Sequence, residues 1–334
     1  MYSKMTLQGA FALITMLLSA CTTIPDAPGN LVPLTADQDP SIPAIEVNGA
    51  RLHSEAFGPE DSTMIICIHG GPGADYKYML NCMSLAESGY RVIFYDQIGS
   101  GLSERFDKSY YTDKGADALT LMYDELAGVI EHYRTSPEQK VYLLGHSWGG
   151  MLAAGFAGYH PDMVQGLVAC EPGGLIWEDI VTYVSTSRAF SLWSETLNDA
   201  TYLDQFITGD ENDHETLDYK LALLASENTI TNEYNVDGGV WRSGAVVNAG
   251  LFEIGMEYEV DLTIGLENFT IPVLFMYSEL NEAYPLSWAE HVSSAFVNAS
   301  LFYVPNAGHS GIIQDPVIWN TITQPRILEY FQSL

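Results

Sequence analysis

Basic residues are scarce in this chain of 334 residues: 13 Lys and Arg stand against 43 Asp and Glu, which gives a formal net charge of −30 at pH 7. A surface this acidic repels phosphate backbones and argues against a nucleic-acid partner. Two explanations of the acidity remain. It provides solubility or salt tolerance, or it creates a field that attracts cationic substrates.

Cysteine is scarce too, with four residues. Cys67 and Cys170 lie in short apolar runs ("MIICIH" and "GLVAC"), where a free thiol behaves as a small hydrophobic group. The spacing of the cysteines fits neither a disulfide framework nor a zinc site. We therefore expect no metal and no other cofactor.

The chain also lacks internal repeats, low-complexity tracts and any apolar run of the roughly 20 residues that span a bilayer. Charged residues make up 17% of the chain and hydrophobic residues 47%, a balance that argues against disorder. The sequence is therefore long and apolar enough to bury a large core.

Residues 1–20 have the pattern of a signal peptide, with a short n-region ("MYSK") and an apolar h-region ("LQGAFALITMLLSA"). The stretch "LLSAC" resembles a bacterial lipobox, in which the signal is cut before the cysteine and the thiol is lipidated. The resemblance implies lipidation of Cys21, and the alternative is an ordinary export signal with an incidental cysteine. Residues 21–43 are Pro-rich and polar, which suits a tether. We expect an exported lipoprotein of a bacterial cell envelope, on the periplasmic or outer-membrane side, that touches the membrane only through this anchor.

From residue 44 the sequence alternates between strand-like and helix-like segments. "MIICIH", "YRVIFYD", "KVYLLG" and "GLVAC" are apolar without alternation, as in parallel strands that are buried on both faces. An antiparallel pair around the "NGA" turn precedes them. This rhythm predicts a doubly wound, mostly parallel α/β sheet built from residues 44–174 and 268–334.

The rhythm stops at residues 175–267, which are aromatic, acidic and mostly helix-like, and strands resume at "IPVLFMYS". We therefore predict that residues 175–267 form a helical cap inserted between two strands of the sheet. Insertions of this kind commonly form lids over active sites.

The motif "GHSWGG", residues 145–150, follows the strand-like "KVYLL" and opens a helix-like segment. G-x-S-x-G in this context is a nucleophile elbow, a strained turn whose small residues let the serine hydroxyl project above the sheet. The motif predicts that Ser147 is a nucleophile. The alternative is a serine at a tight turn that matches the motif by chance.

The motif "HGGPG", residues 69–73, follows the strand-like "MIICI". Its glycines let a backbone N–H face the nucleophile, and Gly71 is the expected donor because Pro72 has no N–H. The amide of Trp148, directly after the nucleophile, is the second expected donor. Together they would form an oxyanion hole, where one donor contributes about 3 kcal/mol to transition-state stabilisation.

Among the eight histidines, His309 is the predicted general base. It lies in "PNAGHS", a Gly-flanked loop after the last predicted strand and before the last predicted helix. His69 and His146 lie inside the two glycine motifs and are expected to organise turns. The other histidines are expected to lie at the surface or to pack in the core.

The motifs "HGGPG", "YDQIGSGLS" and "GHSWGG" resemble the proline iminopeptidase group of α/β hydrolases. The similarity covers residues 44–334 and is closest over 60–172. It implies an α/β-hydrolase fold, with Ser147 as the nucleophile, "HGGPG" as the oxyanion loop and His309 as the base. Enzymes of this group remove an N-terminal residue, often proline, from short peptides. Carboxylates of their cap hold the α-ammonium of the substrate.

Two positions depart from the pattern of that group. Its "DQRG" reads "DQIG" at residues 96–99, so Ile98 replaces an Arg. The position of its catalytic Asp, in a G-x-x-D turn, is occupied by Asn281. An Asn can hold a histidine but cannot stabilise an imidazolium by charge.

Glu171 offers a different acid for the triad. It follows the strand-like "GLVAC" at the carboxyl edge of the sheet, where catalytic groups of open α/β sheets gather. It also keeps the chain order Ser, acid, His. We therefore favour Glu171, with Asn281 itself and its neighbours Glu279 and Glu282 as the alternatives.

The sequence thus predicts a serine hydrolase that uses Ser147, His309 and Glu171 and acts like an aminopeptidase on short peptides or amides, so that its partner is a short peptide or another small molecule. An esterase or lactonase with the same triad and a catalytically weak binding module are the alternatives, because fold alone does not choose the reaction. If the substrate carries an α-ammonium, acidic residues of the cap are expected to hold it, and the candidates are Glu178, Asp179, Glu195 and Glu233.

Overall fold

A computed structural model describes residues 31–188, 210–224, 231 and 239–334. The predicted signal peptide, Cys21 and the first ten residues of the predicted tether lie outside the described residues. The same is true of two of the cap carboxylates, Glu195 and Glu233.

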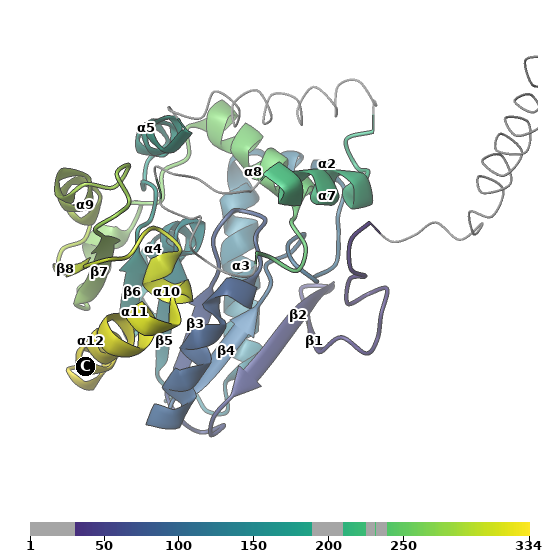
Figure 1. The fold of residues 1–334 in the computed structure, drawn as a ribbon. Coiled ribbons are helices and arrows are strands. Elements are labelled where there is room, and N and C mark those ends of the chain that lie inside the picture. The colour runs from purple at the N-terminus through teal and green to yellow at the C-terminus, as the bar shows by residue number, and fades with distance from the viewer. Residues whose placement is uncertain (1–30, 189–209, 225–230, 232–238) are drawn as a thin grey trace, which may run out of the picture. The chain divides into compact units, whose positions relative to one another are not determined.

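The described residues contain one sheet of eight strands in the order β1-β2-β4-β3-β5-β6-β7-β8 (Figure 1). β1 and β2 are antiparallel around the turn at Asn48 and Gly49, β2 is antiparallel to β4, and each other neighbouring pair is parallel. The doubly wound, mostly parallel sheet predicted from the sequence is confirmed. The strands are β1 (Ala44–Val47), β2 (Ala50–Phe57), β3 (Met64–Ile68), β4 (Arg91–Tyr95), β5 (Val141–His146), β6 (Gly166–Cys170), β7 (Val273–Ser278) and β8 (Ala299–Val304).

Helices cover both faces of the sheet. α3 and α4 pack on one face, and a 3₁₀ helix (Tyr76–Ser88), α10 and α12 pack on the other. The α-helices outside the predicted cap are α2 (Lys108–Thr112), α3 (Ala118–Tyr133), α4 (Trp148–Tyr159), α9 (Leu286–Ser293), α10 (Gly311–Gln314), α11 (Pro316–Ile318) and α12 (Gln324–Gln332). A π-helical turn (Trp319–Thr323) joins the last two, and short 3₁₀ turns lie at Gly115–Asp117, Pro161–Met163 and Leu266–Asn268.

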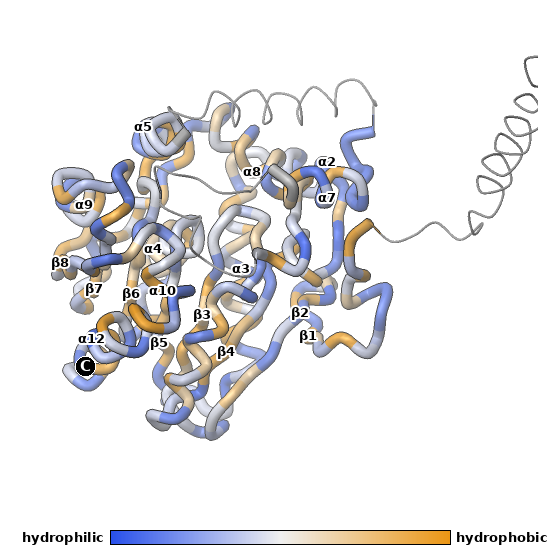
Figure 2. The backbone as a smooth tube through the Cα atoms, viewed as in Figure 1, coloured by the Kyte–Doolittle hydropathy of each residue, from blue (hydrophilic) through white to orange (hydrophobic). Residues whose placement is uncertain are grey.

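The central strands are buried on both faces. In β3, Ile66 and Ile68 belong to the core that includes α3 and α4, whereas Ile65 and Cys67 belong to the core on the other face. Hydrophobic residues follow the central strands along their length (Figure 2). Because both faces are covered, these strands carry apolar residues without alternation.

Three helices lie within residues 175–267: α5 (Trp177–Arg188), α7 (His214–Leu224) and α8 (Ala245–Tyr258). The two ends of this segment pair with each other, since the N–H of Leu262 donates to the carbonyl of Leu175 over 2.8 Å. A β-bridge between Ile176 and Asp261 lies beside this hydrogen bond. The insertion therefore leaves and rejoins the core at one neck.

Buried ion pairs attach α7 to the core. Asp218 is fully buried, and its Oδ2 lies 3.0 Å from Arg105 Nε and 2.7 Å from Arg242 Nε. Arg105 belongs to the loop after β4, and Arg242 precedes α8. Removal of one partner from such a group leaves an uncompensated buried charge, so α7 is firmly held.

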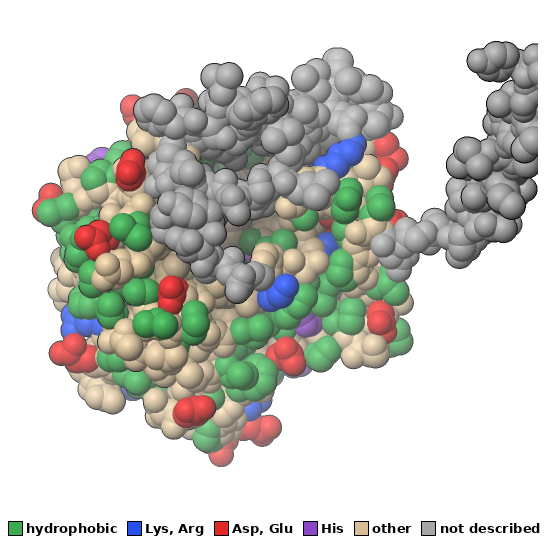
Figure 3. Space-filling model, in the orientation of Figure 1, with side chains coloured by type: hydrophobic (Ala, Val, Ile, Leu, Met, Phe, Trp, Pro, Cys, Tyr) green, Lys and Arg blue, Asp and Glu red, His purple; other side chains and the backbone are tan. Residues whose placement is uncertain are grey.

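The surface carries its acidic side chains in a dispersed way. On the face shown in Figure 3, Asp and Glu are scattered among hydrophobic and other side chains and do not gather in one patch. No described helix combines the length and the apolarity that crossing a bilayer requires.

Candidate active site

Ser147 lies in a strained turn between β5 and α4. Its backbone angles are φ 56° and ψ −124°, in a region that non-glycine residues rarely adopt. The flanking glycines are required by space, because a Cβ on Gly145 would lie 2.2 Å from the carbonyl oxygen of Gly149, and one on Gly149 would lie 1.9 Å from that of Ile68. This geometry is that of a nucleophile elbow.

The "HGGPG" loop faces the elbow from the end of β3. Gly71 has φ +125°, and Gly71, Ser147 and Trp148 line the same pocket. Within the described part of the chain, the amides of Gly71 and Trp148 donate no hydrogen bond. Two unused N–H groups beside a serine hydroxyl are what an oxyanion hole needs.

His309 lies in the loop between β8 and α10, next to the carboxyl ends of the strands. Its Nδ1 is 2.6 Å from Oε2 of Glu171. Its backbone is fixed on both sides, because its N–H donates to the carbonyl of Thr231 over 2.9 Å and its carbonyl accepts from Nε2 of His146 over 2.9 Å. His309 is 7% exposed, so it is enclosed but remains accessible from solvent.

Glu171 is fully buried directly after β6, with φ 43°. Oε1 accepts hydrogen bonds from the N–H and the hydroxyl of Ser278, at 2.6 and 2.5 Å. Oε2 accepts from Nδ2 of Asn281 at 2.7 Å and faces His309. Because the carboxylate is surrounded by donors, Nδ1 of His309 carries the proton and donates it to Oε2, so Nε2 is the unprotonated nitrogen of the ring.

Asn281 does not contact the ring of His309. It supports Glu171 instead, and its Nδ2 is also 3.3 Å from the hydroxyl of Tyr183 on α5. Glu279 is exposed and accepts from the N–H of Asn306 over 2.7 Å, and Glu282 is exposed as well. Of the four residues considered for the third position, the structure brings only Glu171 to the histidine.

His146 joins the oxyanion loop to the loop that carries His309. The N–H of Gly70 donates to the Tyr78 hydroxyl at 2.7 Å, and that hydroxyl lies 2.9 Å from Nδ1 of His146. Nε2 of His146 must carry the proton because its partner is the carbonyl of His309, so the Tyr78 hydroxyl donates to Nδ1. Burial, and then the charge of His309, hold the pKa of His146 well below its usual value and keep it neutral.

Oγ of Ser147 makes no hydrogen bond to His309 or to any other described residue. Hydrogen bonds between nucleophile and base are often long or misaligned without substrate and tighten when substrate binds. The structure therefore places both groups at one site without closing the contact between them.

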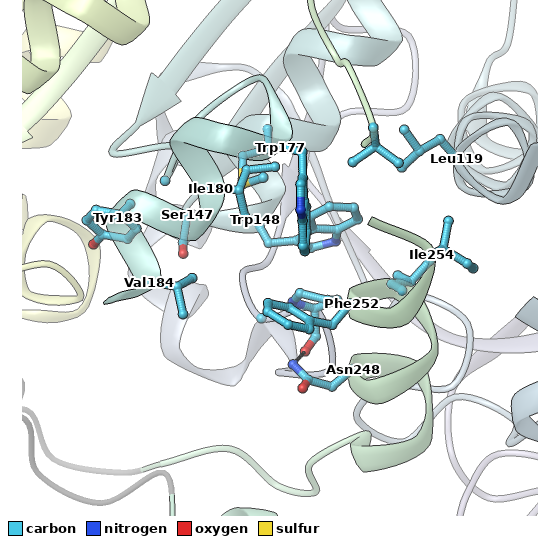
Figure 4. Close-up of a pocket in the computed structure, with 16 residues that line it drawn as sticks. Leu119, Ser147, Trp148, Trp177, Ile180, Tyr183, Val184, Asn248, Phe252 and Ile254 are labelled. Carbon is cyan, nitrogen blue, oxygen red and sulfur yellow. Dashed lines mark hydrogen bonds between the residues drawn. The ribbon is translucent and has the colours of Figure 1, made fainter. Parts of the chain in front are cut away.

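A cavity of about 120 Å³ opens beside Ser147, between the elbow and the helices α5 and α8 (Figure 4). None of the described residues that line it is charged, and most are aliphatic or aromatic. The lining residues are Gly71, Pro72, Leu119, Ser147, Trp148, Met151, Gly173, Trp177, Ile180, Tyr183, Val184, Asn248, Leu251, Phe252, Ile254 and Val260.

The cap carboxylates that the structure describes do not reach this cavity. Glu178 is exposed, and Asp179 pairs with Nε2 of His291 at 3.0 Å. Neither lines the pocket. The expectation that these two residues hold an ammonium group is therefore not met by their positions.

The replacement at Ile98 also lies away from the pocket. Ile98 is buried in the core, and its N–H donates to Oε2 of Glu125 over 2.8 Å. Its neighbour Gln97 supports the site, because its side chain bonds the carbonyl of His69 and the indole N–H of Trp148, both at 2.9 Å. Gln97 thus ties the two glycine motifs together.

Cys67, Cys82 and Cys170 are free and buried. In the described ranges, no group of three His, Cys, Asp or Glu is arranged to hold a metal ion.

Three contributors to the site were not singled out in the sequence: Tyr78, Tyr183 and Asn248. The Tyr78 hydroxyl bonds His146, and the Tyr183 hydroxyl contacts Asn281, which supports Glu171. Asn248 lines the pocket. None of the three belongs to a motif of fixed spacing, so only the folded structure reveals them.

Comparison with known proteins agrees with this geometry. A family model described as alpha/beta hydrolase fold matches residues 63–316. An AB hydrolase superfamily protein, YfhM of Bacillus subtilis, is 25% identical over 299 residues, which cover 86% of this chain and 97% of that protein. A proline iminopeptidase of Thermoplasma volcanium is 32% identical over 133 residues, which cover 39% of this chain and 41% of that enzyme.

Solved structures share the fold at low identity. The enol-lactonase from Burkholderia xenovorans superposes with a TM-score of 0.57 at 15% identity, over 87% of this chain and all of that one (100%). A likeness at this identity speaks for the fold alone. The family model covers most of the chain, the sheet has the expected order, and the resemblance to proline iminopeptidases is borne out by a curated relative. The chain therefore belongs to the α/β hydrolase fold family.

Proposed function

We propose that this α/β hydrolase is a serine hydrolase that works through an acyl-enzyme on Ser147. The observation that carries the proposal is the contact of 2.6 Å between His309 Nδ1 and the buried carboxylate of Glu171, beside a nucleophile elbow. The buried carboxylate also argues against a non-catalytic binding module, because Asn281 does not have to replace the missing acid.

In the first half of the reaction, Oγ of Ser147 attacks the substrate carbonyl and His309 Nε2 takes the serine proton. The carbonyl electrons move to the oxygen, which the N–H groups of Gly71 and Trp148 stabilise. The carbon–leaving-group bond then breaks, and His309 returns the proton to the leaving amine or alcohol.

In the second half, water attacks the acyl-enzyme and His309 takes one of its protons. Collapse of the second tetrahedral intermediate releases the acid and returns the proton to Ser147. Throughout, Glu171 fixes the tautomer of His309 and stabilises the imidazolium. No step needs a metal or a cofactor.

The favoured substrates are short peptides or amides with a small apolar N-terminal residue, cleaved in an aminopeptidase-like way. Two observations support this proposal. The chain resembles proline iminopeptidases over the region that carries both glycine motifs, and the pocket beside Ser147 is small and mainly apolar. An apolar side chain such as proline's gains about 25 cal/mol for each Å² that it buries.

Acetylation of the substrate's α-amine tests this proposal. An aminopeptidase should hydrolyse the free peptide at least about tenfold better in kcat/KM than the N-acetyl form, because a polar group left without its partner in a closed site is costly. The measurement compares proline p-nitroanilide with its N-acetyl derivative. Equal kcat/KM values would reject aminopeptidase specificity.

A carboxylesterase or lactonase is the second candidate. The uncharged lining of the pocket favours it, because none of the described residues that line the pocket offers a carboxylate to an ammonium group. In that case p-nitrophenyl esters of short fatty acids should be turned over faster than any aminoacyl amide. The mechanism above applies unchanged, with an alcohol as the leaving group.

We also propose that the protein is exported and anchored by lipid on Cys21. The support is the signal-like segment before "LLSAC", and nothing in residues 31–334 bears on it. An acyl chain contributes about 0.8 kcal/mol of membrane affinity for each buried CH₂ group.

Replacement of Cys21 by serine is expected to move the protein from the membrane fraction to the soluble fraction. The removed thiol is the acceptor of the proposed lipid, and the Ser147→Ala variant is a control that should stay with the membrane. Fractionation with mass spectrometry of the mature N-terminus checks this. A mature chain that begins elsewhere than at residue 21, or unchanged fractionation of the variant, would rule out lipidation.

A further inference from the structure

Asn248 is the one amide side chain among the described residues that line the pocket, whose other polar side-chain groups are the hydroxyls of Ser147 and Tyr183 and the indole N–H groups of Trp148 and Trp177. It lies on the inner face of α8 and is half-buried (Figure 4). Its Nδ2 donates to the carbonyl of Pro72 in the oxyanion loop over 2.7 Å. A second hydrogen bond, from the N–H of Gly244 to the carbonyl of Gly73 over 2.7 Å, seats the start of α8 on the same loop.

The hydrogen bond to Pro72 fixes which way the Asn248 amide faces. A carbonyl oxygen accepts and cannot donate, so the atom that faces Pro72 must be the NH₂ group. Oδ1 therefore faces away from the loop, and it has no hydrogen-bond partner among the described residues. Because Asn248 lines the pocket, Oδ1 is an acceptor beside a wall that is otherwise mainly apolar.

This acceptor lies close to where the reacting carbonyl must bind. The expected oxyanion donor, Gly71, is joined by its peptide bond to Pro72, whose carbonyl holds Asn248. In a bound substrate the α-substituent is separated from the carbonyl oxygen by only the carbonyl carbon and the α-carbon. A donor on the α-carbon can therefore reach Asn248 while the carbonyl oxygen lies in the oxyanion hole.

We propose that Asn248 Oδ1 accepts a hydrogen bond from an α-N–H group on the acyl part of the substrate. The inference rests on the serine-hydrolase function proposed above and specifies its substrate class: acyl groups with an α-amine. A neutral amide here would do what the sequence predicts of an acidic side chain. It accepts from both the protonated and the neutral amine, so it recognises the N–H group without requiring the charge.

Two substrates that differ only in the α-amine test the proposal: alanine p-nitroanilide and propionic acid p-nitroanilide. The ratio of their kcat/KM values defines the amine preference. Asn248→Leu keeps the size of the side chain and removes the acceptor. It should lower the amine preference about tenfold to a hundredfold, the effect of leaving one buried donor unpaired. If Asn248 only supported the loop, its replacement would lower kcat/KM for both substrates alike and leave the ratio unchanged.

Asn248→Asp tests the direction in which the amine preference changes. The carboxylate keeps an acceptor toward the pocket and adds a charge, while it loses the donor to Pro72. Both substrates should be turned over more slowly, yet the amine preference should rise, opposite to Asn248→Leu. Phe252→Leu, one turn further along the same helix and also in the pocket wall, is the matched control and should leave the ratio within about twofold.

The outcomes separate this inference from the function on which it rests. If wild-type protein hydrolyses both substrates equally, the serine hydrolase stands and recognition of the amine by Asn248 is wrong. If wild-type protein shows the amine preference and both Asn248 variants keep it unchanged, another residue binds the amine and the proposal is also wrong. If wild-type protein hydrolyses neither these amides nor the matching p-nitrophenyl esters, the proposed function itself fails, and this inference with it.

Discussion

Replacement of Ser147 by alanine is expected to abolish hydrolysis, with kcat falling on the order of 10⁶-fold, as in serine hydrolases that lose their nucleophile. The hydroxyl forms the covalent bond to the acyl group, and no other described side chain that lines the pocket is placed in an elbow beside His309 to replace it. The strained backbone at φ 56° is set by the turn and not by the hydroxyl, so the fold should be retained. Turnover of the best p-nitroanilide or p-nitrophenyl ester, with circular dichroism as the check on folding, measures this.

A residual activity above about 1% of wild type would contradict the role of Ser147. Because the hydroxyl has no hydrogen bond to a described residue, the melting temperature should change little. A large loss of stability would mean that the serine holds the elbow together and would weaken any conclusion from the kinetics. The proper comparison is therefore Ser147→Ala against Ser147→Cys, which keeps a nucleophile of similar size.

Replacement of Glu171 by glutamine is expected to lower kcat about 10³- to 10⁴-fold, by analogy with an Asp-to-Asn change in a serine protease triad. The amide removes the charge that stabilises the imidazolium. It also brings an NH₂ group against donors, since Ser278, Asn281 and His309 all donate to the carboxylate. KM should change far less than kcat, because Glu171 lies behind the histidine and does not line the pocket.

A charge-conserving variant shows whether this loss comes from the charge or from misfolding. Glu171→Asp keeps the charge on a shorter side chain and should retain at least about tenfold more activity than Glu171→Gln.

Asn281→Asp decides between Glu171 and Asn281 as the third residue of the triad. If Asn281 were the partner of the histidine, a new carboxylate there should raise activity. In this structure it replaces a donor at 2.7 Å by a like charge beside Glu171, so activity should fall.

The sheet and the two glycine motifs could be predicted because each rests on local chemistry. A strand covered on both faces must be apolar throughout, and only glycine fits at residues 145 and 149 of the elbow. Glu171 could be proposed from its place at a strand end. Its choice over Asn281, Glu279 and Glu282 depended on where the loop after β7 turns, which spacing alone does not determine.

The pocket wall could not be predicted in the same way. Asn248 and Tyr183 lie on α8 and α5, whose sequences carry no motif, and their roles follow from how those helices dock on the core. Acidity in the cap suggested carboxylates for an ammonium group, yet the described candidates face solvent or pair with histidine. Composition indicates which charges are present but not which way they face.

Covalent labelling with a fluorophosphonate tests the central claim most directly, because the reagent reacts only with a serine that a neighbouring base has activated. Digestion and mass spectrometry should find one adduct per chain in wild-type protein, on the peptide that contains Ser147. The adduct should form far more slowly in Glu171→Gln and be absent in Ser147→Ala. No adduct in folded wild-type protein, or equal labelling of wild type and Ser147→Ala, would contradict the account.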